Sequence, residues 1–98
     1  MIESFADTDL RRFFVEDRRS RRIPPEIADR LFRKLQMLDD ATTDADLRVP
    51  PSHHFERLKG RLQERCSIRV NDRWCLVFYW SPDTGNATDL YLDDHSYR

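Results

Sequence analysis

Two alternating runs of residues predict a β-hairpin that brings cationic, hydroxyl and aromatic side chains to one face. The runs extend over 66–70 and 74–80, and a polar turn at 71–73 separates them. A three-residue turn pairs Ile68 with Leu76 and gathers the large apolar side chains on one face, which burial should select. The other face then carries Arg65, Ser67, Arg69, Cys75, Val77 and Tyr79. Such a face is either a solvated surface or a site for a phosphate chain.

Length and composition indicate one small domain over residues 1–98. With 39% hydrophobic and 36% charged residues, the chain can bury a modest core beneath a heavily charged surface. The net charge of −1 conceals a basic centre, because residues 53–75 hold six Lys and Arg against three Asp and Glu. A local basic patch can bind a polyanion even when the whole chain is nearly neutral.

The cysteines and histidines do not have the spacing of a metal site, so we expect no metal and no cofactor. The predicted hairpin puts Cys66 and Cys75 on opposite faces, which indicates free thiols. Taken alone, His53 and His54 are expected at the surface. No apolar run reaches the length of a membrane span or a signal peptide, so we expect a cytoplasmic protein without membrane contact.

The first half of the chain predicts elements that position the hairpin. Residues 1–5 alternate and predict an opening strand. A short helix follows, capped by Asp7 or Thr8. A second helix is expected over 25–39, because Pro25 suits a first turn and apolar residues recur at helical spacing. The helical residues expected to face the core are Leu10, Phe13, Phe14, Ile27, Leu31, Phe32, Leu35 and Leu38.

The second half predicts the rest of a sheet. Residues 41–47 predict a short helical turn capped by Thr42 or Thr43, and 53–58 predict a short strand before the hairpin. The last strand is expected over 89–93. The order of elements predicts an α+β fold in which two N-terminal helices pack on one face of a small antiparallel sheet.

Several segments together resemble a known family. They are Leu58-Lys59-Gly60, the run from Ser67 to Trp74 and the closing Asp93-Asp94-His95, together with 1–5, 34–42, 46–48 and 50–51. With these residues the chain resembles the HigB toxins of the RelE/ParE superfamily, which are the toxins of bacterial type II toxin–antitoxin pairs. The resemblance covers nearly the whole chain and is most specific between 58 and 74.

The resemblance implies both a RelE/ParE-like fold and an activity. Many members of this family cut mRNA in the ribosomal A site, which implies a metal-independent endoribonuclease, an mRNA interferase acting on the 70S ribosome. It also implies a helix-turn-helix antitoxin of the HigA type. Operator DNA would then be contacted only through that antitoxin.

Metal-free RNA cleavage needs a base for the 2′-OH, cations for the phosphate and an acid for the leaving 5′-oxygen. By resemblance, Lys59 and Arg69 match positions that contact the phosphate and the transition state. Asp93 and His95 match the acid and the histidine of the family's C-terminal Asp-Tyr-His motif. Further contacts to RNA are expected from Arg57, Arg65, Arg73, Tyr79, Tyr91 and His54.

Three positions depart from the family pattern. Glu56 stands near the usual histidine before Leu-Lys-Gly, so either Glu56 is the base, or His54 reaches in, or the activity is weak. Cys75 replaces an arginine, and a missing phosphate cation costs about 2–4 kcal/mol in the transition state. Asp94 replaces the tyrosine of Asp-Tyr-His and adds negative charge where RNA would lie.

These departures keep two other functions open beside a weakly active nuclease. One is a non-enzymatic growth inhibitor that acts on a protein target, as in the gyrase-poisoning ParE branch. The other is an operon co-repressor with a degenerate active site, which acts mainly in its DNA-bound complex with the antitoxin.

Overall fold

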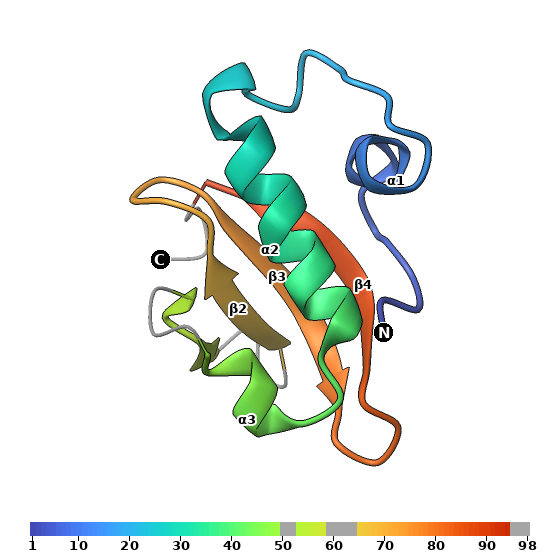
Figure 1. Ribbon diagram of the computed structural model, residues 1–98, viewed down its shortest axis with the longest axis vertical. Coiled ribbons are helices and arrows are strands. Elements are labelled where there is room, and N and C mark those ends of the chain that lie inside the picture. The colour runs from blue at the N-terminus through green and yellow to red at the C-terminus, as the bar shows by residue number, and fades with distance from the viewer. Residues whose placement is uncertain (50–52, 59–64, 95–98) are drawn as a thin grey trace.

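A computed structural model describes residues 1–49, 53–58 and 65–94 of the chain (Figure 1). Within these residues, four helical elements precede a four-stranded sheet. The helical elements are α1 (Thr8–Val15), the 3-10 helix η1 (Pro25–Ile27), α2 (Ala28–Asp40) and α3 (Asp44–Leu47), and the strands are β1 (Glu56–Arg57), β2 (Arg65–Arg69), β3 (Cys75–Ser81) and β4 (Asn86–Asp93).

The helices begin where short polar side chains cap them. Asp7 caps α1, because its carboxylate accepts the N–H of Leu10 at 3.1 Å. Thr43 caps α3 through a capping box with Asp46. The Asp46 carboxylate also accepts the N–H groups of Thr42 and Thr43, and these hydrogen bonds lower its pKa. The sequence left two candidates for each N-cap. The structure confirms Asp7 rather than Thr8 for α1, and Thr43 rather than Thr42 for α3.

The second predicted helix is found as two consecutive pieces. The chain enters through Pro25 in η1 and continues as α2 to Asp40, one residue beyond the expected end. Proline is tolerated there because a first-turn N–H has no intrahelical partner. The predicted apolar stripe is buried against the sheet, whereas Phe32 keeps 40% of its surface exposed beside the rings of Phe13 and Phe14.

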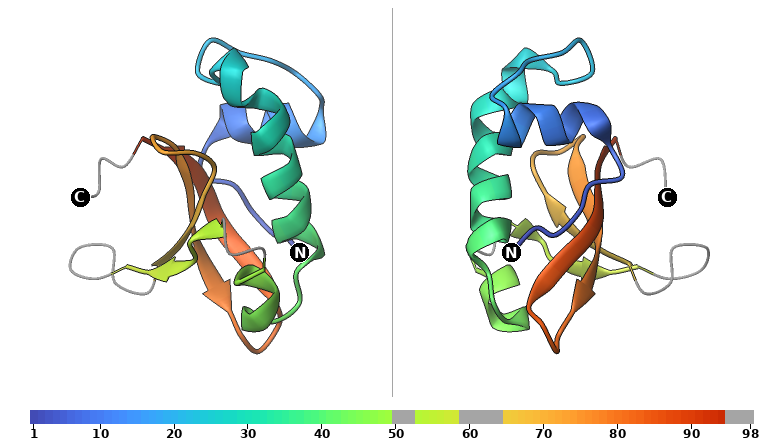
Figure 2. Two further views of the ribbon diagram at one scale, coloured as in Figure 1. Left: turned by 60° about the vertical axis from the view of Figure 1, so that its left-hand side comes forward. Right: turned by 90° about the vertical axis from the view of Figure 1, so that its right-hand side faces the viewer.

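The strands follow one another in space in the order β1-β2-β3-β4, and each pair is antiparallel. Cys66 lies opposite Phe78 and Ile68 opposite Leu76, so the three-residue turn and its register are confirmed. Figure 2 shows α1 and α2 on one side of this sheet. Their apolar stripes share one core with the inward residues of the strands and with Val70, which follows β2; the strand residues are Cys66, Ile68, Leu76, Phe78, Trp80, Ala87 and Leu90.

A β-bulge interrupts the pairing of β3 with β4. The register shifts between Val77 and Tyr79, and Asp89 on β4 adopts a positive φ of 53°. The N–H of Asp89 donates to the hydroxyl of Ser4 at 3.0 Å. The bulge lets Leu90 enter the core while Tyr91 points to the opposite face of the sheet.

Two predicted strands are shorter than expected. The opening segment makes isolated parallel bridges to β4, Ile2 with Ala87 and Phe5 with Leu90, instead of a continuous strand. The strand expected over 53–58 is confined to β1. His54 has a φ of 44°, a left-handed conformation that breaks an extended run before Glu56.

No helix in the described parts of the chain is long and apolar enough to cross a membrane. Cys66 and Cys75 are both buried, and neither is part of a disulfide. They belong to separate apolar clusters on the two faces of the sheet, as the predicted register requires.

Candidate nucleic-acid interface

The sheet face away from the helices, called the rear face here, carries most of the predicted site residues that the structure describes. Residues directly opposite each other on neighbouring strands point to the same side of a sheet. One such row contains Arg69, Cys75 and Asp93, from β2, β3 and β4. The next row contains Glu56, Ser67, Val77 and Tyr91, from all four strands. The register thus brings together residues distant in sequence.

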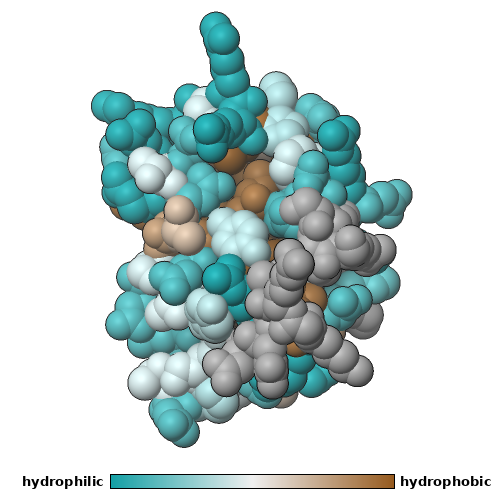
Figure 3. Space-filling view, turned by 180° about the vertical axis from the view of Figure 1, so that it is seen from behind, coloured by the Kyte–Doolittle hydropathy of each residue, from teal (hydrophilic) through white to brown (hydrophobic). Residues whose placement is uncertain are grey.

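The floor of the rear face is apolar. Cys75 is 1% exposed and packs in a small cluster with Leu58, Val77 and Tyr91. Figure 3, which views the molecule from behind, shows apolar surface near the middle of a largely hydrophilic face. The sequence left open whether this face is a solvated surface or a phosphate site, and the cluster gives it an apolar centre with a polar rim. Charges on such a rim are less screened than charges in open water.

Glu56 and Arg69 lie on diagonal positions of two paired strands. Glu56 is opposite Ser67, and Arg69 is two residues further along β2. Diagonal neighbours on one face are about 7–8 Å apart at their Cα atoms, within reach of two long side chains. Asp93 lies two strands from Arg69, about 10 Å away at Cα. An acid and a guanidinium at this separation can flank a single phosphodiester.

Arg65 is fixed between two tyrosine rings on the rear face. Its guanidinium carbon lies 4.7 Å from the ring centroid of Tyr79 and 5.4 Å from that of Tyr91. Burial alone would lower the pKa of Arg65, but hydrogen bonds and charge interactions with the two phenols leave it raised. Burial raises the pKa of Tyr91, and its phenol oxygen accepts a hydrogen bond from Arg65. The site thus has a positioned cation between two aromatic rings.

Three other predicted contacts lie away from the rear face. Arg57 forms an ion pair with Asp44 of α3 and stacks over the ring of Phe55. Arg73 lies in the hairpin turn, over the ring of Trp74. His54 faces α2 rather than the sheet face. Lys59 and His95, both predicted as catalytic, lie outside the described residues.

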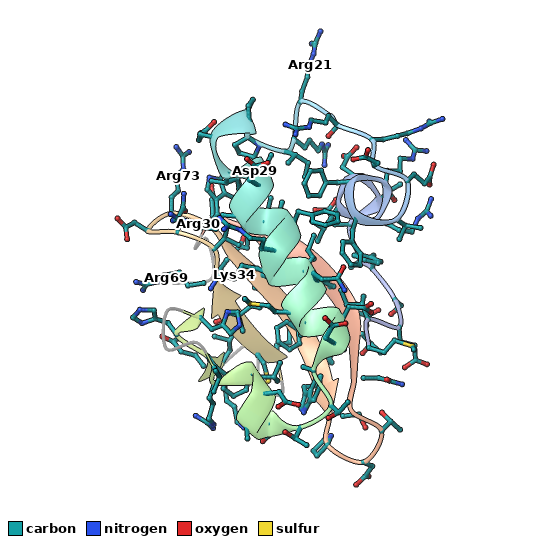
Figure 4. The ribbon with its side chains drawn as sticks, viewed as in Figure 1. Arg21, Asp29, Arg30, Lys34, Arg69 and Arg73 are labelled. Carbon is teal, nitrogen blue, oxygen red and sulfur yellow. The ribbon has the colours of Figure 1, made fainter. Side chains whose placement is uncertain are left out.

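A hollow of about 450 Å³ opens where α2 faces the hairpin end of β2, and Arg69 reaches it from the sheet. Figure 4 shows Arg30, Lys34 and Arg69 on this side of the molecule. We call it the basic hollow, and its lining residues are Arg30, Arg33, Lys34, Met37, His54, Arg69, Val70, Asn71 and Asp72. The α2 cations were not among the predicted site residues. Their i, i+3, i+4 spacing was the available signal, because it places all three on one helix face.

Lys34 and His53 form a buried polar pair behind the basic hollow. The Lys34 ammonium, on a residue 7% exposed, donates to His53 Nδ1 at 2.9 Å. Burial lowers the pKa of Lys34, and Arg30 and Arg33 lower it further. Burial, together with the charge of Lys34, lowers the pKa of His53 to about 4. The expectation that His53 is a surface residue was wrong, since it is 2% exposed and accepts from the lysine.

This pair predicts a pH dependence of stability. The folded pKa of His53 is about 4, below the ordinary 6.5, so the unfolded chain binds more protons between these values. The contribution of neutral His53 is therefore complete above pH 6.5 and is lost as the pH falls towards 4. We expect the free energy of unfolding to drop by about 2–3 kcal/mol over this window. Urea denaturation at a series of pH values measures it.

His53→Gln provides the matched control for that titration. Glutamine keeps an acceptor for Lys34 and does not titrate, so the variant should lose most of the slope between pH 6.5 and 4. An equal slope in the variant and the wild type would assign the effect to other groups.

Comparison with known proteins identifies the family. Residues 3–95 match the RelE-like toxin of type II toxin–antitoxin system HigB. Toxin HigB-1 of Vibrio cholerae is 46% identical over 97 residues, which cover 99% of this chain and 100% of that protein. The chain belongs to the HigB family of RelE-like toxins. An uncharacterized protein of Haemophilus influenzae is 38% identical over 96 residues, which cover 98% of this chain and 93% of that protein.

Membership of the HigB family gives the site its biological setting. This HigB-type chain is the toxin of a type II toxin–antitoxin system, and such a system provides it with a cognate antitoxin. The resemblance on which the sequence interpretation depended is therefore confirmed, as is the α+β fold with its antiparallel sheet. In the described residues, no group of three or more His, Cys, Asp or Glu side chains could hold a metal ion.

Proposed function

We propose that this HigB toxin is a ribosome-dependent mRNA endonuclease of the cytoplasm that cleaves through the 2′-OH of its substrate. The observation that carries the proposal is the shared rear face of Glu56 and Arg69, diagonal neighbours on β1 and β2. Metal-free cleavage requires a base and a phosphate cation within one nucleotide of each other, and this pair meets that requirement.

In the proposed reaction Glu56 takes the proton of the 2′-OH as the 2′-oxygen attacks the adjacent phosphorus. The bond from phosphorus to the 5′-oxygen breaks, and His95, assisted by Asp93, gives a proton to that oxygen. Arg69 and Lys59 stabilise the charge that develops on the phosphate oxygens. The products are a 2′,3′-cyclic phosphate and a 5′-hydroxyl.

The remaining residues of the rear face would hold the RNA. Arg65 is positioned by Tyr79 and Tyr91, and it offers a planar fork of donors to a neighbouring phosphate. The outer faces of the two rings can stack on bases. We further propose that the antitoxin is a helix-turn-helix protein of the HigA type and that operator DNA is bound only through it.

The experiment combines purified toxin, ribosomes and an mRNA with a mapped cleavage position. A single 2′-deoxy nucleotide at that position should abolish cleavage there, because the attacking oxygen is missing. Products of the all-ribose mRNA should carry 2′,3′-cyclic phosphate ends. Continued cleavage of the deoxy substrate at the same bond would contradict the proposed chemistry.

A second candidate function is favoured by the buried Cys75. The thiol occupies the row between Arg69 and Asp93, where the family has a cation. A toxin without cleavage activity would act as a non-enzymatic growth inhibitor or as a co-repressor bound to its antitoxin. Growth arrest with intact transcripts would identify a non-enzymatic inhibitor. Operator binding by the toxin–antitoxin complex, with neither growth arrest nor transcript cleavage by the toxin, would identify a co-repressor.

A further inference from the structure

The basic hollow is built from like charges that belong to two different elements. Arg30, Arg33 and Lys34 face it from α2, and Arg69 faces it from β2. Asp72 is the acidic residue among the lining residues. Cations brought this close repel one another, and the repulsion is relieved when an anion lies between them.

The lysine of the hollow is unusual for its burial. Lysine is among the residues least often buried in proteins, yet Lys34 is 7% exposed. His53 Nδ1, at 2.9 Å, fixes the direction of its side chain. Burial and the neighbouring Arg30 and Arg33 lower the pKa of Lys34, which is the direction expected where positive charges are crowded. A phosphate in the hollow would relieve this crowding.

Arg69 connects the hollow to the proposed cleavage site. It lies in a rear-face row with Cys75 and Asp93. As the last residue of β2, it also lines the hollow. An RNA strand whose cleaved phosphate lies at Arg69 therefore has a continuous basic path from the rear face towards α2. We propose that the basic hollow binds a phosphate of the substrate RNA next to the cleaved one, an inference that rests on the proposed function.

The lining chemistry favours a nucleic-acid phosphate over an acidic peptide. Arg30 and Arg33 present planar forks of donors from consecutive turns of α2, which suits the oxygens of a phosphodiester. A peptide segment would also bury apolar side chains, and the apolar residues among the lining residues are Met37 and Val70. An acidic segment of the antitoxin is the competing occupant.

The test compares two variants that lose the same charge. Arg30→Gln with Arg33→Gln removes exposed cations of the hollow, and Arg19→Gln with Arg21→Gln removes exposed cations of the loop before η1. Figure 4 shows Arg21 extending away from the hollow. The probe is a fluorescent 2′-O-methyl oligonucleotide, which cannot be cleaved through its 2′-oxygen. Anisotropy gives its affinity at several salt concentrations.

The hollow variant should bind the probe roughly tenfold more weakly than the wild type, and the loop variant should bind almost as the wild type does. The slope of log affinity against log salt should become shallower by about 0.7 for each phosphate that the hollow no longer binds. Affinity equal to the wild type in the hollow variant, or an equal decrease in both variants, would overturn the inference. So would unchanged RNA binding together with weakened antitoxin binding, which would assign the hollow to the antitoxin.

The probe also separates this inference from the proposed function. Binding of an uncleavable RNA does not require cleavage, whereas the deoxy-substrate experiment does. If no mRNA is cleaved in that experiment but the hollow variant still binds the probe more weakly than the loop variant, the nuclease proposal is wrong and the phosphate site stands. If the wild type cleaves mRNA but the two variants bind the probe equally well, the nuclease proposal stands and the phosphate-binding role of the hollow is wrong.

Discussion

Replacement of Arg69 by glutamine should slow mRNA cleavage by about 10²- to 10³-fold, which corresponds to roughly 3–4 kcal/mol of transition-state stabilisation. Among the described residues, Arg69 is the cation in the row that also holds Asp93, and a cysteine rather than a second Lys or Arg stands between them at position 75. Glutamine keeps a hydrogen-bonding side chain of similar reach but removes the charge. The measurement is the single-turnover cleavage rate on saturating programmed ribosomes.

Arg21→Gln is the matched control for this substitution, because Arg21 is exposed on the loop before η1 and extends away from the sheet (Figure 4). It should cleave within about twofold of the wild type. Both variants should unfold at similar urea concentrations and bind the antitoxin. An Arg69→Gln toxin as fast as the Arg21→Gln toxin would show that this guanidinium is not catalytic.

Replacement of Glu56 by glutamine should slow cleavage by about 10²-fold or more, the usual contribution of a general base. Glutamine is nearly isosteric with glutamate but cannot accept the proton of the 2′-OH. The expected loss is in the rate at saturation rather than in RNA binding, since Glu56 carries no positive charge. Glu26→Gln, an exposed glutamate of η1, is the control and should leave the rate unchanged.

His54→Ala distinguishes the two candidate bases. The imidazole of His54 lines the basic hollow beside α2, whereas Glu56 lies in a rear-face row. The variant should therefore retain most of the cleavage rate. A large loss in His54→Ala with normal cleavage by Glu56→Gln would transfer the role of base from the glutamate to the histidine.

The hairpin was predictable because two independent requirements agree on one register. Alternation fixes which residues share a face, and burial excludes the pairing that would place Arg69 opposite Trp74. Local chemistry supports the same turn, since the side chain of Asn71 accepts the N–H groups of Arg73 and Trp74 at 2.9 and 2.7 Å. The shared face of Arg65 and Tyr79 followed from this register without any tertiary information.

The basic hollow and the buried pair behind it were not predictable in the same way. Lys34 lies between Arg33 and Leu35 in the sequence and has the same local signature as a solvated helical lysine. Its burial depends on where the segment with His53 crosses α2, which is a tertiary property. The apolar centre of the rear face was equally hard to predict, because the contact of Leu58 with Cys75 depends on the pairing of β1 with β2.

The bulge in β4 has a consequence for how this strand tolerates changes in length. Asp89 is the extra residue at which the inward and outward parity of the strand reverses. Removal of that single residue would restore a regular ladder and leave Ala87 and Leu90 inward and Tyr91 outward. Deletion of Thr88 would have the same effect, because Asp89 would then take the outward place between Ala87 and Leu90. Deletion of Leu90 would instead place Asp89 at the inward position opposite Phe78. Natural deletions in this strand are therefore expected to cluster at positions 88 and 89.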